Sequence, residues 1–492
     1  MNQTDLGNAM MFAKVNAGKL RYVPQWKTWA RWDGRRWMID SGGKSPHDAA
    51  KATLKALVDE ANSLSNAAKR VDLIRWALES ESKKRITAMI QLAQCEDPLC
   101  VDADRFDRDQ WLLNVRNGTI DLRTGQLLPH RPGDLITKLA DVDFDPTATC
   151  PRWDRFLLEI MDGDPEMAGY LMRIIGHALT GDVSEHCLFF FWGGGRNGKS
   201  LLLKTVQAIL GDYAATVNAS LLTSKHQDDH PTGLADLEGR RLVATIEVAD
   251  GKRMAEALVK QLTGGDRIKA RRMRQDFREF EPTHKLVMAA NHKPEIRGAD
   301  EGIWQRIKLV PFPVTFVGPD KVDPDRKRFL IDRSLDQSLK EEHAGILASA
   351  VRSCLEWQSA GLEVPAKVGE ATNSYRLESD EVSAFIRDRC TVLLLDAPKS
   401  PNRAEVGLLY STYRSWCQET GGASMSSRNL AARLDQLGHK IAKSNGRAYR
   451  SGLRLLSGLT DSQNAALAAS ESASHSVTDV AAQVTAVNSL RV

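Results

Sequence analysis

The chain has 492 residues, of which 42% are hydrophobic and 26% are charged, as is ordinary for a globular protein. The formal net charge is only +4, so nucleic-acid binding cannot be inferred from the total and must be sought in local basic clusters. No run approaches 18 apolar residues, and the N-terminus lacks a charged segment followed by an apolar core. We therefore expect neither a membrane span nor a secretory signal.

The cysteines predict free thiols in a reducing compartment, most simply the cytoplasm. There are seven of them, scattered along the chain. Cys95 and Cys100 have the spacing of half a zinc site, but no second Cys/His pair follows at finger spacing.

Residues 1–150 predict an α+β domain. Asp33-Gly34 lies between aromatic runs, which is typical of a β-hairpin. Apolar spacings predict helices between residues 49 and 93, and residues 111–134 have the texture of short strands. The nearby tryptophans are expected to form the core of a small sheet, although a base-stacking platform stays open. They are Trp26, Trp29, Trp32 and Trp37. Prolines at 146 and 151 place a boundary near residue 150.

Residues 188–203 predict a phosphate-binding loop between a strand and a helix. Five apolar residues, Leu188 to Trp192, precede G-x-x-x-x-G-K-S, and an apolar helix start follows. Glycines let backbone N–H groups turn toward phosphate oxygens, and the helix N-terminus adds positive charge. Lys199 is expected to reach the β/γ-phosphates of ATP, and the Ser200 hydroxyl to coordinate Mg²⁺. The predicted nucleotide contacts are Gly193, Gly194, Gly195, Arg196, Asn197, Gly198, Lys199, Ser200 and Leu201.

Further strands are predicted at residues 241–247, 285–290 and 307–312. Because helical or longer segments separate them, they predict a parallel α/β sheet. Three polar residues at the ends of these strands are candidate catalytic groups.

Glu247 ends the first of these strands, where it could activate water near the γ-phosphate and support Mg²⁺. Asn291 follows the second and could hold the water or sense the γ-phosphate. Arg306 precedes the third and could stabilise transition-state charge on a neighbouring subunit's nucleotide. The alternatives are a surface glutamate, a loop-starting asparagine and a surface arginine.

Basic residues gather between the first and second of these features, Glu247 and Asn291. Alternation around Ile268 and Ala270 predicts a β-hairpin with a basic tip, suited to gripping a phosphate backbone. A solvated cationic surface is the alternative. The candidate DNA contacts are Lys269, Arg271, Arg272 and Arg274.

Residues 376–456 predict a small winged-helix domain, with three helices and a terminal hairpin. Such domains bind DNA or dock proteins, and both possibilities stay open. The basic residues expected on its recognition helix and wing are Arg428, Arg433, Lys440, Lys443, Arg447 and Arg450. Residues 457–492 are rich in Ala, Ser and Val and are expected to be disordered.

These motifs, in this order, resemble a superfamily 3 helicase of the D5-type primase–helicase family of phages and plasmids. The motifs are GGGRNGKS at 193–200, QLTGGDRIKARRMR at 261–274, LVMAANHKPEI at 286–296 and DEGIWQRIKLVPF at 300–312. The resemblance implies an AAA+-like P-loop core over residues 151–375, flanked by the N-terminal and winged-helix domains. It also assigns Glu247, Asn291 and Arg306 to the family's acid, polar sensor and arginine finger.

The resemblance further implies a DNA helicase of a phage or mobile element in a bacterial cytoplasm, driven by ATP and Mg²⁺. It implies a homo-oligomeric ring, most simply a hexamer, with single-stranded DNA in its channel. Two departures stand out: no primase-type zinc or carboxylate cluster precedes residue 100, so any primase is expected on a partner chain, and Glu247 lacks a second adjacent acid. The rival functions are an ATP-dependent origin-binding or assembly protein and a DNA-packaging-type ATPase.

Overall fold

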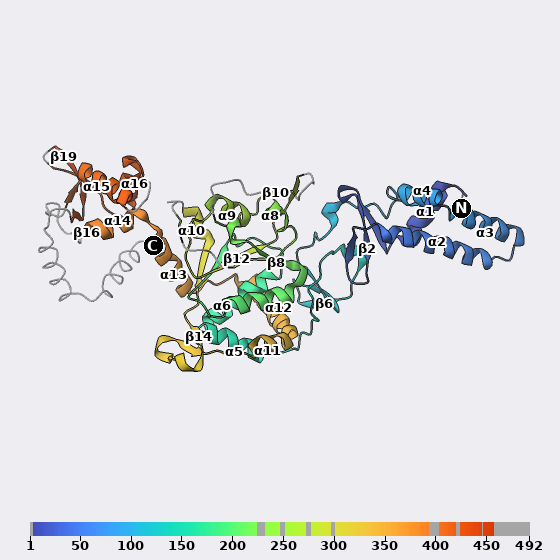
Figure 1. The fold of residues 1–492 in the computed structure, drawn as a ribbon, viewed down its shortest axis with the longest axis horizontal. Coiled ribbons are helices and arrows are strands. Elements are labelled where there is room, and N and C mark those ends of the chain that lie inside the picture. The colour runs from blue at the N-terminus through green and yellow to red at the C-terminus, as the bar shows by residue number, and fades with distance from the viewer. Residues whose placement is uncertain are drawn as a thin grey trace. The chain divides into compact units, whose positions relative to one another are not determined.

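The computed structural model describes residues 3–223, 232–246, 251–271, 277–296, 301–392, 403–419, 424–444 and 446–456. The chain divides into two compact units, Met1–Asn373 and Ser374–Val492 (Figure 1). The predicted disordered tail lies outside the described residues. No helix in the described ranges has both the length and the apolar character needed to cross a membrane.

The N-terminal part of the first unit is a small sheet with helices, as predicted. Its elements are α1 (Asp5–Asn16), β1 (Leu20–Val23), β2 (Thr28–Trp32), β3 (Trp37–Asp40), α2 (Lys44–Asn62), α3 (Ala67–Ser80) and α4 (Lys83–Ala93). The predicted hairpin joins β2 to β3 in an antiparallel pair, and Gly34 takes a φ of +102° in its turn. Trp29 and Trp37 are buried in the core, which confirms that interpretation of the tryptophan cluster.

A second antiparallel sheet follows, in the order β4-β5-β6. The strands are β4 (Leu112–Val115), β5 (Gly118–Asp121) and β6 (Gln126–Leu128). Their buried residues Leu113 and Ile120 belong to the same hydrophobic core as Phe191 of the central sheet. The boundary expected near residue 150 therefore does not coincide with a break in the core, because these strands pack onto the region that follows.

The centre of the first unit is a five-stranded sheet in the order β13-β7-β12-β9-β8. Its strands are β7 (Leu188–Trp192), β8 (Ala214–Val217), β9 (Leu242–Ile246), β12 (Lys285–Ala290) and β13 (Ile307–Pro311). All neighbours pair in parallel, which confirms the predicted sheet. The three inner strands are buried along almost their whole length, as expected for parallel strands covered on both faces.

Helices and short strands surround this sheet. They are α5 (Pro151–Ile160), α6 (Pro165–Ala178), α7 (Lys199–Leu210), α8 (Thr232–Ala235), α9 (Glu256–Thr263), α10 (Glu301–Arg306), α11 (Leu335–Glu341), α12 (His343–Ala360), β10 (Ile268–Ala270), β11 (Arg278–Phe280), β14 (Thr315–Val317) and β15 (Arg328–Leu330). Asp164 caps α6 by accepting from the backbone N–H groups of Glu166 and Met167. Helices α6 and α12 lie side by side (Figure 1).

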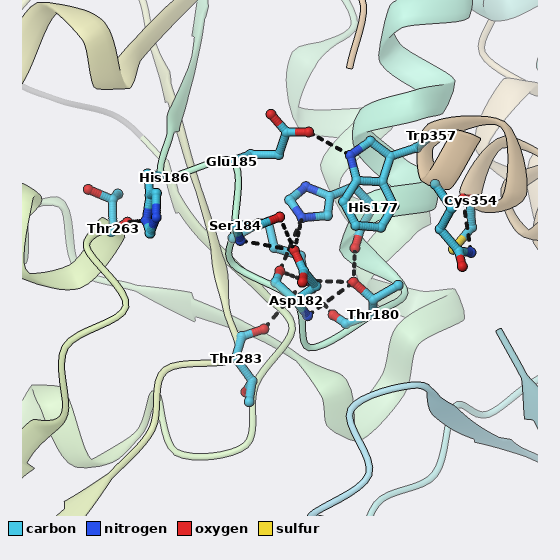
Figure 2. Close-up of polar contacts among 12 residues, drawn as sticks. His177, Thr180, Asp182, Ser184, Glu185, His186, Thr263, Thr283, Cys354 and Trp357 are labelled. Atoms are coloured by element: carbon cyan, nitrogen blue, oxygen red, sulfur yellow. Dashed lines mark hydrogen bonds and ion pairs between the residues drawn. The ribbon is translucent and has the colours of Figure 1, made fainter. Parts of the chain in front are cut away.

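Buried polar groups close the amino ends of the central strands. The Lys285 amine, at the start of β12, donates to the carbonyl oxygens of Thr180 and Asp182, and burial holds its pKa well below the usual value. Figure 2 shows the neighbouring His177 imidazole beside Trp357, whose indole N–H donates to Glu185 at 2.7 Å. These contacts fill the amino end of the sheet with buried, hydrogen-bonded side chains.

The second unit has three helices and a hairpin where they were predicted. Its elements after α13 (Ala366–Ser379) are α14 (Glu381–Arg389), β16 (Cys390–Val392), β17 (Arg403–Glu405), α15 (Val406–Glu419), α16 (Ser427–Gln436), β18 (Ile441–Ser444), β19 (Arg447–Ser451) and β20 (Leu453–Leu455). Strands β18 and β19 pair antiparallel. Phe385, Tyr413 and Trp416 pack together in the core. The winged-helix interpretation of this arrangement stays a prediction.

Two of the arginines expected on the recognition helix and wing of this unit form internal contacts. Arg450 is 2% exposed and donates to Asp435 at 2.5 Å and to the carbonyl of His439. Arg433 pairs with Asp380 at 3.1 Å, and both side chains are largely buried. Both lie on the elements predicted for them, Arg433 on α16 and Arg450 on β19, but each guanidinium donates to oxygen atoms of its own unit.

Candidate nucleotide-binding site

The predicted phosphate loop connects β7 to α7 at the carboxyl edge of the sheet. Its geometry needs glycine at two positions. A Cβ on Gly193 would lie 2.5 Å from the carbonyl oxygen of Phe312, and Gly198 has a φ of +88° with Ile160 2.5 Å from where its Cβ would be. Gly194 and Gly195 face open space, so a ligand can approach their backbone closely.

Lys199 is the first residue of α7, and its side chain is only 5% exposed. Its amine donates to the carbonyl of Gly193 at 2.8 Å, to Oδ1 of Asn197 at 3.0 Å and to Oδ1 of Asn291 at 3.2 Å. Burial lowers the pKa of this amine to about 8, because the neighbouring oxygens are neutral and do not replace the lost water fully. A buried cation held only by neutral oxygens is well suited to an anionic ligand.

Two asparagines frame this amine. Asn291 follows β12 directly, and β12 pairs with β7, so the carboxyl ends of both strands meet at the loop. The sequence placed Asn291 at such a strand end, and the structure brings it to Lys199. The Nδ2 group of Asn197 is buried without a hydrogen-bond partner in the part of the chain that the structure describes. An unpartnered donor beside a buried amine fits an anion that accepts from both.

A cavity of about 930 Å³ opens beside the loop, a size that holds a nucleotide. One wall is α5, another is the parallel pair β14–β15, and the loop with the start of α7 forms the floor. Three aromatic side chains line the cavity: Phe156, Phe316 and Phe329. The backbone N–H of Phe316 donates to the carbonyl of Arg196 at 2.7 Å, which ties β14 to the loop.

The cavity also has charged residues near its mouth. Arg152 pairs with Glu159 and Asp332, each at 3.2 Å, while Arg155 and Arg196 line the same space. The cavity thus combines an apolar, aromatic part with a basic edge next to the phosphate loop. That is the chemistry of a base and ribose joined to phosphates.

Arg306 lies at the other end of the sheet from the phosphate loop. It precedes β13, whose first residue Ile307 pairs with Leu188 at the start of β7. Five strand residues separate that edge from the loop, a distance of about 16 Å. The guanidinium donates to the carbonyl of Gly302 at 2.8 Å. The fold does not bring Arg306 to the loop of its own chain.

The other predicted site residues stand as follows. Ser200 is exposed on α7 beside Lys199, and Leu201 lines the cavity. Lys269 and Arg271 are exposed on the predicted hairpin, whose strands β10 and β11 pair antiparallel. Glu247, Arg272 and Arg274 lie outside the described residues. Among the described residues, the loop fits a triphosphate, and the Ser200 hydroxyl is the oxygen that could bind Mg²⁺.

Sequence reasoning missed the aromatic walls of the cavity. Phe156 is one of several buried apolar residues on α5 and belongs to no motif. Phe316 and Phe329 lie on strands of three residues each, which are too short to show a period. The aromatic and β-branched composition of Thr315–Val317 is the one feature that could have indicated β14.

The chain matches two known families. Residues 9–162 match the family described as D5 N terminal like, and residues 191–306 match a family of unknown function, DUF5906. The second match begins in the phosphate-loop strand and ends at Arg306, so it includes the loop, Lys199 and Asn291 but not the aromatic walls of the cavity.

Viral proteins are among the relatives. A protein of Acanthamoeba polyphaga mimivirus named as a candidate helicase is 28% identical over 325 residues, which cover 63% of this chain and 33% of that protein. A protein of Invertebrate iridescent virus 6, also named as a candidate helicase, is 26% identical; the match covers 66% of this chain and 36% of that protein. A candidate primase of African swine fever virus is 25% identical; the match covers 63% of this chain and 34% of that protein.

The chain is thus similar to viral proteins that are named as helicases and primases. More particularly, the matches confirm the resemblance predicted from the motifs, because the matched family models and the named relatives are those of viral D5-like primase–helicases. The chain spans about a third of the length of these relatives. A solved structure of the NrS-1 C-terminal region covers 89% of this chain and 97% of its own, with a TM-score of 0.48 and 10% identity.

Proposed function

We propose that this chain is an ATP-driven DNA helicase that acts in the replication of a virus, phage or other mobile element. The observation that carries the proposal is the buried Lys199 amine, held by four neutral oxygens at the floor of a nucleotide-sized cavity. The proposal that ATP hydrolysis is coupled to DNA rests on the family relationship. The proposal that the chain acts in replication rests on its relatives, because they are named as helicases and primases.

ATP is expected to bind with its phosphates in the loop and its base in the aromatic part of the cavity. Lys199 then exchanges its contacts with Asn197 and Asn291 for phosphate oxygens, and its charge is stabilised by the ligand. The Asn197 amide gains the acceptor that it lacks. The base can lie against Phe316 or Phe329, where stacking contributes about 1 kcal/mol.

Hydrolysis transfers the γ-phosphoryl group to water. The water oxygen forms a bond to phosphorus, the bond to the bridging oxygen of ADP breaks, and Glu247 accepts the water proton. Asn291, once Lys199 has turned to the phosphates, is free to orient that water. Bound Mg²⁺, for which Ser200 provides a hydroxyl ligand, supplies charge that neutralises the phosphate oxygens.

The position of Arg306 favours a ring of identical chains. Because Arg306 lies about 16 Å from its own loop, its guanidinium can stabilise the transition state only on the nucleotide of a neighbouring chain. We therefore propose a homo-oligomer, most simply a hexamer, with ATP between subunits. Mixing Lys199→Ala with Arg306→Ala chains should then restore part of the ATPase activity, since mixed interfaces contain one intact site. No gain above the sum of the two variants would refute action on a neighbour.

The primary test measures ATP hydrolysis with and without single-stranded DNA, together with strand displacement on a forked duplex. We expect stimulation by DNA and displacement of one strand, and loss of both in Lys199→Ala. Lys204→Ala is the matched control, because Lys204 lies on the same helix but is exposed and pairs with Asp336 at 2.9 Å. Turnover indifferent to DNA would instead favour an assembly ATPase that binds an origin. Stimulation by DNA without strand displacement would favour a packaging-type ATPase.

A further inference from the structure

The β10–β11 hairpin presents an aromatic side chain to solvent beside two cations. Phe277 precedes β11 and is 50% exposed, although phenylalanine is usually buried. Lys269 places its amine 5.5 Å from the centre of the Phe277 ring, and Arg271 places its guanidinium 4.8 Å from it.

The register of the hairpin explains why these three side chains share a face. Lys269 pairs with Glu279 and Ala270 pairs with Arg278, so the next opposed pair in the same alternation is Arg271 with Phe277. Ile268 and Ala270, on the other face, are buried. The hairpin therefore anchors itself through one face and holds Phe277, Lys269 and Arg271 outward on the other.

We infer that Phe277 stacks on a base of single-stranded DNA while Lys269 and Arg271 contact the phosphates on either side. A flat apolar ring bordered by cations is complementary to a single strand, which presents unpaired bases between negative phosphates. It is poorly matched to a duplex, whose bases are already stacked. This inference rests on the proposed function, and it adds to the predicted phosphate contacts a contact to the bases themselves.

The test compares two strands of equal length and charge, one of thymidylates and one of abasic sites. Binding of each to the full chain is measured by fluorescence anisotropy at several salt concentrations. Phe277→Ala should weaken thymidylate binding by about 5- to 150-fold, the range found when one stacked aromatic is removed. It should leave abasic binding and the slope of log K against log salt unchanged. Phe277→Trp should restore thymidylate binding.

Lys269→Ala is expected to behave differently. It should weaken both strands alike and reduce the magnitude of the salt slope by about 0.7, since it removes one phosphate contact. Leu78→Ala on α3 removes a comparably exposed apolar side chain, 59% exposed, and should change nothing. A thermal melt of each variant checks the fold.

Equal losses on both strands in Phe277→Ala, or no loss on thymidylates, would overturn the base contact while leaving the proposed helicase intact. Failure of the wild-type chain to bind either strand would overturn both. A loss confined to the thymidylate strand supports the base contact.

Discussion

The buried Lys199 amine should make ATP binding depend on pH in a range where ordinary lysines do not titrate. Its pKa in the free protein is about 8, whereas an exposed lysine titrates near 10.4. A bound triphosphate favours the charged amine and so raises the pKa. With a pKa of 8, about ten of eleven molecules carry the charge at pH 7 and about one of eleven at pH 9. ATP affinity should therefore fall about tenfold between these values, about 1.4 kcal/mol.

Calorimetric titration with ATP at several pH values measures this directly. At pH 8.5, binding should take up about 0.8 proton per ATP, which appears as a dependence of the heat on the ionisation enthalpy of the buffer. Lys199→Arg is the control, because guanidinium stays charged throughout this range, so whatever affinity remains should be independent of pH. Constant wild-type affinity from pH 7 to 9, or an equal fall in the arginine variant, would refute the reasoning.

Three other predictions concern the loop, the cavity and the base of the sheet. Gly198→Ala should abolish ATP binding and lower the unfolding free energy by about 1 kcal/mol or more, because its φ is +88° and its Cβ site is filled; Gly194→Ala, in open space, should lose far less stability in a thermal shift assay. Phe316→Ala and Phe329→Ala should each weaken ATP by up to about tenfold without weakening inorganic tripolyphosphate, as displacement assays would show; equal losses for both ligands would contradict a base contact. His284 is buried with neither ring nitrogen hydrogen-bonded among the described residues, and its pKa is lowered to about 4. Its contribution to stability is therefore complete above pH 6.5 and is lost as the pH falls toward 4, at a cost of about 1.4 kcal/mol by pH 5.5. Between pH 7 and 5.5, the free energy of unfolding of His284→Leu, measured by urea denaturation, should accordingly fall by about 1 kcal/mol less than that of wild type. An equal fall in both proteins would contradict the assignment.

The central sheet was predictable because its strands are short apolar runs that end in turn or loop residues. Residues 188–192 and 285–290 were predicted at the bounds that the structure shows. Buried parallel strands are apolar on both faces, and few other segments of this length have that composition. The positions of Lys199 and Asn291 follow from the same fact, since both lie just beyond carboxyl ends of adjacent strands.

The cavity walls were not predictable, because they depend on contacts between segments far apart in sequence. Phe156 and Phe329 are separated by more than 170 positions, and neither belongs to a motif. The strands β14 and β15 hold only three residues each, and pairing with each other rather than local propensity makes them strands. The sequence shows that these residues are apolar but does not show which of them face a ligand.

Charge in the sequence was a similarly incomplete guide to surfaces. Arg450 and Lys269 are each a basic residue beside small or apolar neighbours, yet Arg450 is buried against Asp435 while Lys269 is exposed. The difference arises from strand alternation and from which carboxylates lie within reach after folding. In this chain, we consider a basic strand residue a candidate DNA contact only where buried neighbours on the opposite face of the strand keep its side chain exposed. Lys269 and Arg271 meet that condition through Ile268 and Ala270, and this is why the hairpin, rather than the C-terminal unit, is the surface on which we expect substitutions to change DNA binding.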